Sequence, residues 1–554
     1  MKIQKTENSS GIGKRQRGFR NNMIAYAGII VYIIGLMIRI PLTKAIGEKG
    51  IGLLAPALEL FMLITLLFSY GISRTMTGLI RYRVKRKQFK CARKVFHVAF
   101  RLSVLISLAL ALILAVTSGF ISDILVLESM SRNAILAVAP VIVLTALVNV
   151  FRGYFNGNGF GVLVAHSQYI EKITMLIATI LGGRFMLDYG MKVAALKQKE
   201  MLAYAYGALG AILGIMISEI ITLIYLLLVF AIYSGTWKRQ LGEDSGRKME
   251  SSGEITSMLF GNGIPVACIV ILSNIFMLID QRFFNYCMNR REAGNIRAEL
   301  WGSYYGKFAV LTGIGAALGC LAVHGSIGKI VNAYEREEYR VMRERIGSTV
   351  KKLCIIVLPL AINLAVLSEA FVKGICQGED ELVVGLVRRG TVLIIFSGFA
   401  YLFGQLMMKL RMTKELLLAI VISLAVHVLA VFGLVRKGLM GAEGIVYSVM
   451  IFMGILAILC FFFTARRLRY RQELLYSFAL PAVSAGISGL VVMLLNKLLL
   501  HMAGNLLTIL IGCLIGTILY IMLLMVLRVV NEGELAGIPF GGVWISIGRM
   551  IGVL

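Results

Sequence analysis

The feature that most constrains this chain is its repetition of apolar stretches about 20 residues long, the length a helix needs to cross a bilayer. Such stretches occupy residues 22–41, 51–72, 95–118, 133–151, 167–187, 201–233, 257–282, 301–331, 350–372, 387–408, 415–435, 441–463, 474–496 and 505–527. In lipid, each helix satisfies its own backbone hydrogen bonds, whereas an open strand leaves them unpaired. The sequence therefore predicts an all-α polytopic membrane protein with about 14 transmembrane helices.

The composition supports this class and excludes several others. Of 554 residues, 58% are hydrophobic and only 16% are charged, whereas soluble proteins are roughly a quarter charged. The eight cysteines are scattered without a CxxC pair, so we expect neither a disulfide framework nor a metal site. The chain contains no Walker-type GxxxxGK[ST] motif, so we expect no ATP hydrolysis on this chain and no bound cofactor.

The net charge of +28 is distributed as membrane topology requires. Roughly 35 of the Lys and Arg residues fall in alternate connections and in the two tails, against roughly 15 in the opposite connections. The runs RYRVKRKQFKCARK (81–94) and RRLRYR (466–471) lie on the basic side. By the positive-inside rule this side is cytoplasmic, and so are both termini. We expect this charge to contact anionic membrane lipids and no nucleic acid.

A polar, glycine- and serine-rich segment near the middle divides the chain and is typical of a flexible linker. The predicted organisation is a cytoplasmic tail (1–21), an N-lobe of helices 1–6 (22–233), a cytoplasmic linker (234–256), a C-lobe of helices 7–12 (257–463), helices 13–14 (474–527) and a second cytoplasmic tail (528–554). Two six-helix lobes around a central cavity suit a transporter that works by alternating access.

Ionisable residues inside spans are costly, and they are functional candidates by default. The predicted cavity or substrate-binding residues are Arg39, Glu59, Arg101, Arg152, Glu171, Glu219, Asp280, Arg282 and Lys307. The arginines near span ends have an alternative role as anchors that reach the membrane interface. The carboxylates at 59, 219 and 280 reach the interface less easily, so each is expected to have a buried partner or a water-filled cavity.

The charges of the outer half are predicted to form a gate. Asp280 and Arg282 are two residues apart and point to different faces of one helix, so each needs a partner elsewhere. The expected partners are Arg39 for Asp280, and Glu59 for Arg282 or Lys307. His427 is expected to be a packing residue.

Specific motifs carry a family resemblance. The segment IRIPLTKAIGEKGIGLLAPALELFMLI (38–64) resembles the first helical hairpin of the stage V sporulation protein B group. IPVACIVILSNIFMLIDQRFFN (264–285) and ELAGIPFGG (534–542) resemble its helix 7 and its tail. FRGYFNGNGFGVLVAHSQYIEKITML resembles its helix 4–5 junction, with matches at Arg152, Gly153, Tyr154, Phe155, Gly157, Ser167, Gln168 and Glu171. Unlike the group, the chain has GVLVAHSQ in place of a Pro-Thr pair, and its helix 8 lacks the usual prolines (313–328), which leaves the substrate open.

The resemblance implies a member of the MOP superfamily, which includes the MurJ-type lipid II flippases. It implies export, across the bacterial cytoplasmic membrane, of a lipid-linked sugar or peptidoglycan precursor of the undecaprenyl diphosphate type. The pathway served would be cell-wall, spore-cortex or polysaccharide synthesis, with cell-wall synthases as candidate partners. The coupling ion (Na⁺ or H⁺) or a membrane-potential drive stays open.

Two other functions remain as alternatives. A multidrug or cation antiporter of the same superfamily would need an acidic and apolar cavity, whereas cationic residues balance or outnumber acidic ones in these spans. A membrane polysaccharide polymerase or ligase would need catalytic groups on a sizeable external loop, and the predicted outer loops are short.

The junction motif also carries local expectations. Arg152 is predicted to stabilise the carbonyl end of helix 4, where a cation suits the helix dipole. Gly153 and Gly157 are predicted to permit the reversal of the chain, and Glu171 to face the cavity at the start of helix 5.

The topology is directly testable. A reporter that is active only outside the cytoplasm, fused after residue 245, should give no signal because this loop lies on the basic side. The same reporter fused after residue 197, in an outer loop, should be active. A strong signal from the fusion at residue 245 would show that the protein has the opposite orientation in the membrane.

Overall fold

The computed structural model describes residues 26–245, 250–288, 294–376, 378, 380–437, 440–535, 541–550 and 552. Within these residues every regular element is a helix, of α, 3-10 or π type, which confirms the predicted all-α class. Twelve helical segments of this described part are long and apolar enough to cross a membrane. The protein is thus a multi-pass, all-helical membrane protein.

Where the structure describes them, the predicted spans lie on helical segments, although the count of twelve is lower than the predicted fourteen. The first of the twelve, Tyr26–Lys85, is 60 residues long and breaks at Gly47, whose φ of 74° and ψ of 166° are not helical. A similar break at Gly504 (φ 70°, ψ 168°) divides α19 (Leu480–Val526). The polar residues of α6 (Gly161–Lys197) include Glu171, and this helix is not one of the twelve. The two counts differ because the first two predicted spans form one bent segment and because α6 is not among the twelve.

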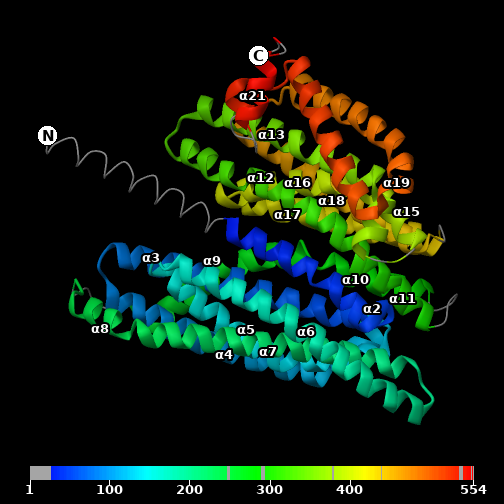
Figure 1. Cartoon of the computed structure of the whole chain (residues 1–554). Helices are drawn as coiled ribbons and strands as arrows, with labels where there is room; N and C mark the ends of the chain where they lie inside the picture. Colours follow the sequence, from blue (N-terminus) through cyan, green and yellow to red (C-terminus); the bar gives the residue numbers. More distant parts are fainter. Residues whose placement is uncertain are drawn as a thin grey trace. The chain divides into compact units, whose positions relative to one another are not determined.

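The contacts divide the chain into two compact units, and the first comprises residues up to Gly306 together with Ile420–Ile445. Its helices are residues 26–37, α2 (Arg39–Leu66), η1 (Leu67–Ser73), α3 (Arg74–Lys85), α4 (Phe89–Phe120), η2 (Ile121–Val126), η3 (Ser129–Ser131), α5 (Arg132–Gly157), α6, α7 (Met201–Ile232), α8 (Ser234–Gly242), α9 (Ser252–Leu272), α10 (Phe276–Met288) and α11 (Gly294–Ser303). Helices α5, α6 and α7 pack on one another, and α2 packs on α11 (Figure 1).

The second unit comprises Lys307–Ala419 and Val446–Leu554. Its helices are α12 (Ala309–Glu335), α13 (Tyr339–Val366), α14 (Ser368–Phe371), η5 (Val372–Cys376), α15 (Glu381–Gly390), α16 (Val392–Lys409), η7 (Leu475–Ala479), α19, α20 (Glu532–Leu535) and α21 (Gly541–Met550). The unit boundaries fall within η4 (Tyr304–Phe308), α17 (Thr413–Val431) and α18 (Gly441–Leu468), and η6 (Phe432–Lys437) belongs to the first unit. The lobes 22–233 and 257–463 are predicted as parts that move together during transport. This division stays a prediction, because the two units are defined by contacts alone.

The predicted linker contains more regular structure than its composition suggests. Residues 234–242 form α8, and α9 begins at Ser252. Ser251 and Glu254 form a reciprocal capping box at the start of α9, which satisfies two backbone donors. Trp237 of α8 is buried among Tyr154, Phe160 and other aromatic side chains. The described part of the linker is therefore partly helical and docked, not an open coil.

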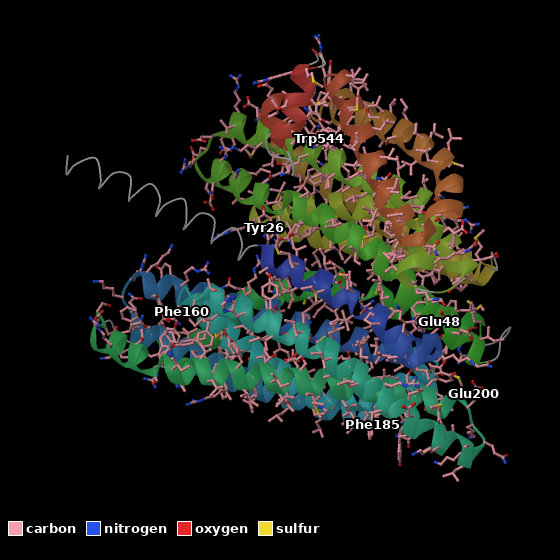
Figure 2. All side chains as sticks on the ribbon, in the orientation of Figure 1. Tyr26, Glu48, Phe160, Phe185, Glu200 and Trp544 are labelled. Atoms are coloured by element: carbon pink, nitrogen blue, oxygen red, sulfur yellow. The ribbon has the colours of Figure 1, made fainter. Side chains whose placement is uncertain are left out.

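Apolar side chains cover the outer faces of several spans. On α4, Val116 is 77% exposed, and on α6 Phe185 is 73% exposed and points away from the helix bundle (Figure 2). Exposed apolar patches on this scale mark contact with lipid or with another protein. Along helices of membrane-spanning length, lipid explains them.

The contact between α6 and α7 is a backbone contact through glycines. A Cβ atom on Gly210 would lie 2.2 Å from the carbonyl oxygen of Gly182, and one on Gly214 would lie 2.4 Å from that of Ala178. Small residues let membrane helices approach closely where apolar burial alone does not drive association. This approach aligns the polar residues of α6 with those of α7.

We expect Gly210→Ala to destabilise the protein by about 1–3 kcal/mol, because the added methyl group overlaps a backbone atom that cannot rotate away. The measurement is the thermal unfolding midpoint in nanodiscs. Gly78→Ala is the matched control, since Gly78 is on helix α3 with open space around it. An equal midpoint for the two variants would contradict the close packing of α6 and α7.

Candidate functional site

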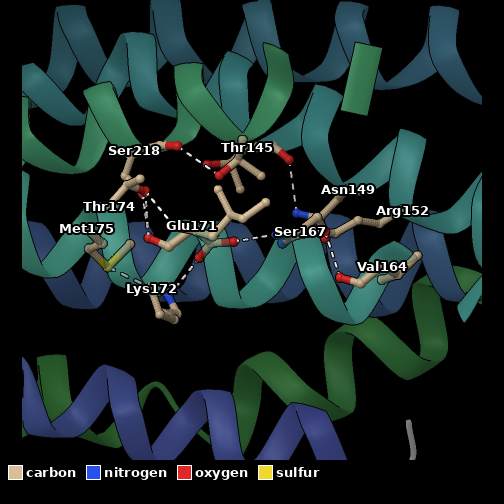
Figure 3. A network of polar contacts seen from close by, with 12 residues as sticks. Thr145, Asn149, Arg152, Val164, Ser167, Glu171, Lys172, Thr174, Met175 and Ser218 are labelled. Carbon is tan, nitrogen blue, oxygen red and sulfur yellow. Dashed lines mark hydrogen bonds and ion pairs between the residues drawn. The ribbon is translucent and has the colours of Figure 1, made fainter. Parts of the chain in front are cut away.

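A network of polar side chains joins α5 to α6 inside the first unit (Figure 3). Arg152 of α5 donates from Nε to Ser167 Oγ at 2.9 Å, and its Nη2 lies 2.7 Å from Glu171 Oε2. Lys172 Nζ donates to Glu171 Oε1 at 2.7 Å. Two cations therefore share one carboxylate. Glu171 is buried, while the side chains of Arg152 and Lys172 keep 12% and 17% of their exposure.

Helix α7 closes this network from the other side. Ser218 Oγ donates to the backbone oxygen of Glu171 at 2.7 Å and lies 3.0 Å from Thr174 Oγ1 (Figure 3). The next residue, Glu219, is 2% exposed, and its Oε2 has no hydrogen-bond partner among the described residues. Its charged neighbours are Glu171, Arg152 and Lys172. The structure thus brings together three of the predicted residues and adds Lys172.

The residues of the junction motif have other structural roles than those predicted from the sequence. Helix α5 continues past Arg152 to Gly157, so Arg152 does not cap its end. The reversal occurs at residues 158–160, where Gly159 has a φ of 88°. Gly153 lies inside α5 and Gly157 is its last residue, and Cβ atoms on them would stand 2.5 Å from Met76 and 2.7 Å from Ile80. These glycines permit close helix packing rather than the turn. Glu171 lies in the third turn of α6, packed against α7.

A second cluster joins α2 to η4. The Arg39 guanidinium carbon stands 3.9 Å from the centre of the Tyr305 ring. The Tyr305 hydroxyl donates to Glu59 Oε1 at 2.6 Å, and both Tyr305 and Glu59 are almost fully buried. Arg39 and Glu59 are thus brought together by a residue that the sequence did not single out, because 246 positions separate Tyr305 from Glu59.

The predicted gate pairing of Asp280 is wrong for this structure. Asp280 is 1% exposed, and its Oδ1 lies 2.9 Å from Nε2 of the fully buried His427. Arg39 is the predicted partner, but it lies over Tyr305 instead. The buried imidazole therefore lies within ion-pair distance of the carboxylate. His427 is therefore a polar partner, not only a packing residue; a histidine inside an apolar span was the available signal.

The remaining predicted residues lie outside these clusters. Arg101 is exposed on α4. Arg282 donates to the backbone oxygens of Ile124 and Leu125, at 3.0 Å from the latter, and so binds the carbonyl end of η2 rather than Glu59. Lys307 pairs with Asp380 at 3.1 Å within the second unit. Arg282 and Lys307 therefore have other partners than Glu59, the partner that the sequence predicted for either of them.

Comparison with known proteins identifies the family. The model of the polysaccharide biosynthesis protein family matches residues 22–299, half of the chain. The chain belongs to this family. Stage V sporulation protein B of Bacillus subtilis (strain 168) is 24% identical over 204 residues. That match spans 37% of this polysaccharide biosynthesis family member and 37% of the relative's own length.

Solved structures share the fold. The lipid II flippase MurJ in an inward closed conformation is 15% identical, with a TM-score of 0.61 over 90% of this chain and 97% of MurJ. An inward-facing multidrug resistance transporter of the MATE family is 13% identical, with a TM-score of 0.60 over 79% of this chain and 94% of that chain. At these identities the likeness shows the fold alone. Together with the family match and the stage V sporulation protein B relative, this shared fold confirms the MOP superfamily resemblance of the sequence motifs.

The network around Glu171 should be structurally coupled. Glu171→Gln leaves Arg152 and Lys172 without their shared carboxylate, and breaking a buried pair costs about 3–5 kcal/mol, less where the cations keep some exposure. We expect a clearly lower thermal unfolding midpoint in nanodiscs. Asp188→Asn on the same helix breaks an ion pair with Arg184 whose side chains are 60% and 49% exposed, and such pairs contribute at most about 1 kcal/mol. Equal midpoints would show that the network is not needed for stability.

Proposed function

We propose that this protein is a flippase that moves a lipid-linked sugar or peptidoglycan precursor, carried on an undecaprenyl diphosphate type of lipid, across the cytoplasmic membrane. The polysaccharide biosynthesis family and the fold shared with a lipid II flippase support a lipid-linked substrate. The supply would serve cell-wall, spore-cortex or polysaccharide synthesis.

One observation carries the choice of an anionic substrate. Arg39 is half-buried, and no carboxylate of the described residues lies within ion-pair distance of its guanidinium group. The flat face of the guanidinium group stacks on the Tyr305 ring. The N–H donors lie along the edge of the guanidinium plane and can bind two phosphate oxygens at once. A charge kept in a span without an ionic partner is typical of a binding site.

The network around Glu171 offers a second cationic position. Arg152 and Lys172 carry two positive charges against the single carboxylate they contact, and both retain some exposure. An anionic headgroup would balance the remaining charge. We therefore assign Arg39 and the Arg152–Lys172 pair to headgroup binding, with Glu59, Glu171 and Glu219 as carboxylates that position or balance these cations.

The transport cycle proposed is alternating access by the lobes 22–233 and 257–463, with both termini in the cytoplasm. The basic turn between α3 and α4 would then face anionic lipid headgroups, because Lys85, Arg86 and Lys90 are exposed there. Cell-wall synthases are the candidate protein partners. A proton, a sodium ion or the membrane potential would supply the drive.

A second candidate function is drug or cation antiport, which the fold shared with a MATE transporter favours. Its substrate would be an organic cation, and the buried carboxylates Glu59 and Glu219 would bind it. Ethidium efflux from proteoliposomes, without movement of a lipid diphosphate, would select this function over the flippase.

The flippase proposal is tested in proteoliposomes with a fluorescent lipid diphosphate disaccharide, whose exposure is measured with a membrane-impermeant quencher. We expect Arg39→Ala to lower the translocation rate at least about tenfold, since a charge-assisted phosphate contact contributes about 1.5–3 kcal/mol. Arg39→Lys should restore part of the rate, because lysine keeps the charge and loses the two-pronged geometry.

Arg184→Ala is the matched control, because Arg184 is an exposed arginine on α6 whose ion-pair partner among the described residues is Asp188. It should translocate like the parent protein. If Arg39→Ala also does so at equal reconstituted amounts, Arg39 is an interfacial anchor and the headgroup assignment is wrong.

A further inference from the structure

The geometry points to Tyr305 as a positioning residue for anionic headgroup recognition: it holds the Arg39 guanidinium by its face and leaves its N–H edge for phosphate oxygens. This inference rests on the proposed function, since it assumes that Arg39 binds an anion. It adds a residue that neither the sequence motifs nor the family assignment singles out.

The first step is the stack itself. The Arg39 guanidinium carbon lies 3.9 Å from the Tyr305 ring centre, inside the range of about 6 Å for a cation–π contact. An arginine on a flexible stem loses rotamer freedom when it binds a ligand. A ring that already fixes the guanidinium plane removes part of that cost. The donors stay available, because they lie in the plane and the ring occupies only one face.

The second step is that burial and a hydrogen bond to Glu59 hold the Tyr305 ring in place. Tyr305 is 1% exposed, and its hydroxyl donates to Glu59 Oε1 at 2.6 Å. The other oxygen of Glu59 has no hydrogen-bond partner among the described residues. The buried Glu59 carboxylate therefore holds the Tyr305 hydroxyl by a hydrogen bond at one of its two oxygens. Glu59 also lies within the electrostatic reach of Arg39, so it attracts the guanidinium without pairing with it and without occupying its donors.

The third step is the packing of α11 and η4 on α2, which places Tyr305 beside Arg39. A Cβ atom on Gly302 would lie 1.9 Å from the backbone oxygen of Glu48, and one on Gly306 would lie 2.7 Å from Thr43 Oγ1. Thr43 Oγ1 in turn donates to the backbone oxygen of Arg39 at 2.7 Å. The residue after Tyr305 therefore packs against Thr43, one turn beyond Arg39 on α2. Tyr305 itself sits in a short π-helix, and such turns often occur at functional sites.

The binding test uses farnesyl diphosphate as the probe, with farnesol as its uncharged counterpart, on the full chain in nanodiscs. Tyr305→Leu removes the stack, and we expect farnesyl diphosphate to bind roughly tenfold more weakly, as it should in Arg39→Ala. Farnesol binding should not change. Tyr305→Phe keeps the stack and loses only the hydroxyl, so its affinity should fall between the parent and Tyr305→Leu. Tyr520→Phe is the matched control, because Tyr520 is a buried tyrosine of the second unit whose hydroxyl has no hydrogen-bond partner in the described part of the chain.

A double-mutant cycle separates positioning from a general structural effect. If Tyr305 acts through Arg39, adding Tyr305→Leu to Arg39→Ala weakens probe binding no further. If Tyr305→Leu weakens binding by the same factor in both backgrounds, Tyr305 does not act through Arg39 and the inference is overturned.

A second measurement does not depend on any ligand. Phenylglyoxal modifies arginine side chains, and the modification rate of Arg39 is read by mass spectrometry. Release from the ring should raise this rate severalfold in Tyr305→Leu and leave that of Arg184 unchanged. A raised rate in a protein that does not bind farnesyl diphosphate would uphold the positioning and overturn the diphosphate assignment. An unchanged rate for Arg39 would overturn the positioning itself.

Discussion

The constraint on which this structure depends is the cost of an ionised side chain among apolar helices. Lipid offers no water to such a group, so a partner must come from the protein. The first unit supplies these partners between segments far apart in sequence. Glu59 accepts a hydrogen bond from Tyr305, 246 positions away, and Asp280 lies 2.9 Å from His427. Each pair joins two helical segments.

The departures from this rule are informative. Arg39 has a ring rather than a carboxylate against it, and Glu59 and Glu219 each have one oxygen without a hydrogen-bond partner among the described residues. A headgroup or an ion could supply the missing partners at these positions. Incomplete satisfaction is tolerated in proteins chiefly at functional sites.

Close helix packing makes these arrangements accessible. Gly182 and Gly210 bring α6 and α7 into backbone contact, and this places Ser218 on the carbonyl of Glu171. Gly302 does the same for α11 and α2, and this brings Tyr305 over Arg39. The glycines of the junction motif have the same role, since Gly153 and Gly157 pack α5 on η1 and α3. A glycine in a span can serve a turn or a contact, and only the packed neighbours distinguish the two.

The sequence by itself determined the class of this protein, because membrane-spanning length and apolarity are properties of each segment alone. It also located the ionisable residues, Glu171 and Asp280 among them, whose burial makes them candidates. The tertiary structure decided which residues meet. The sequence-based pairing of Asp280 with Arg39 was wrong, and Tyr305 went unnoticed, because contacts across hundreds of positions depend on how helices rotate and approach one another. That rotation is set by the summed packing of many small side chains, and no single motif records it.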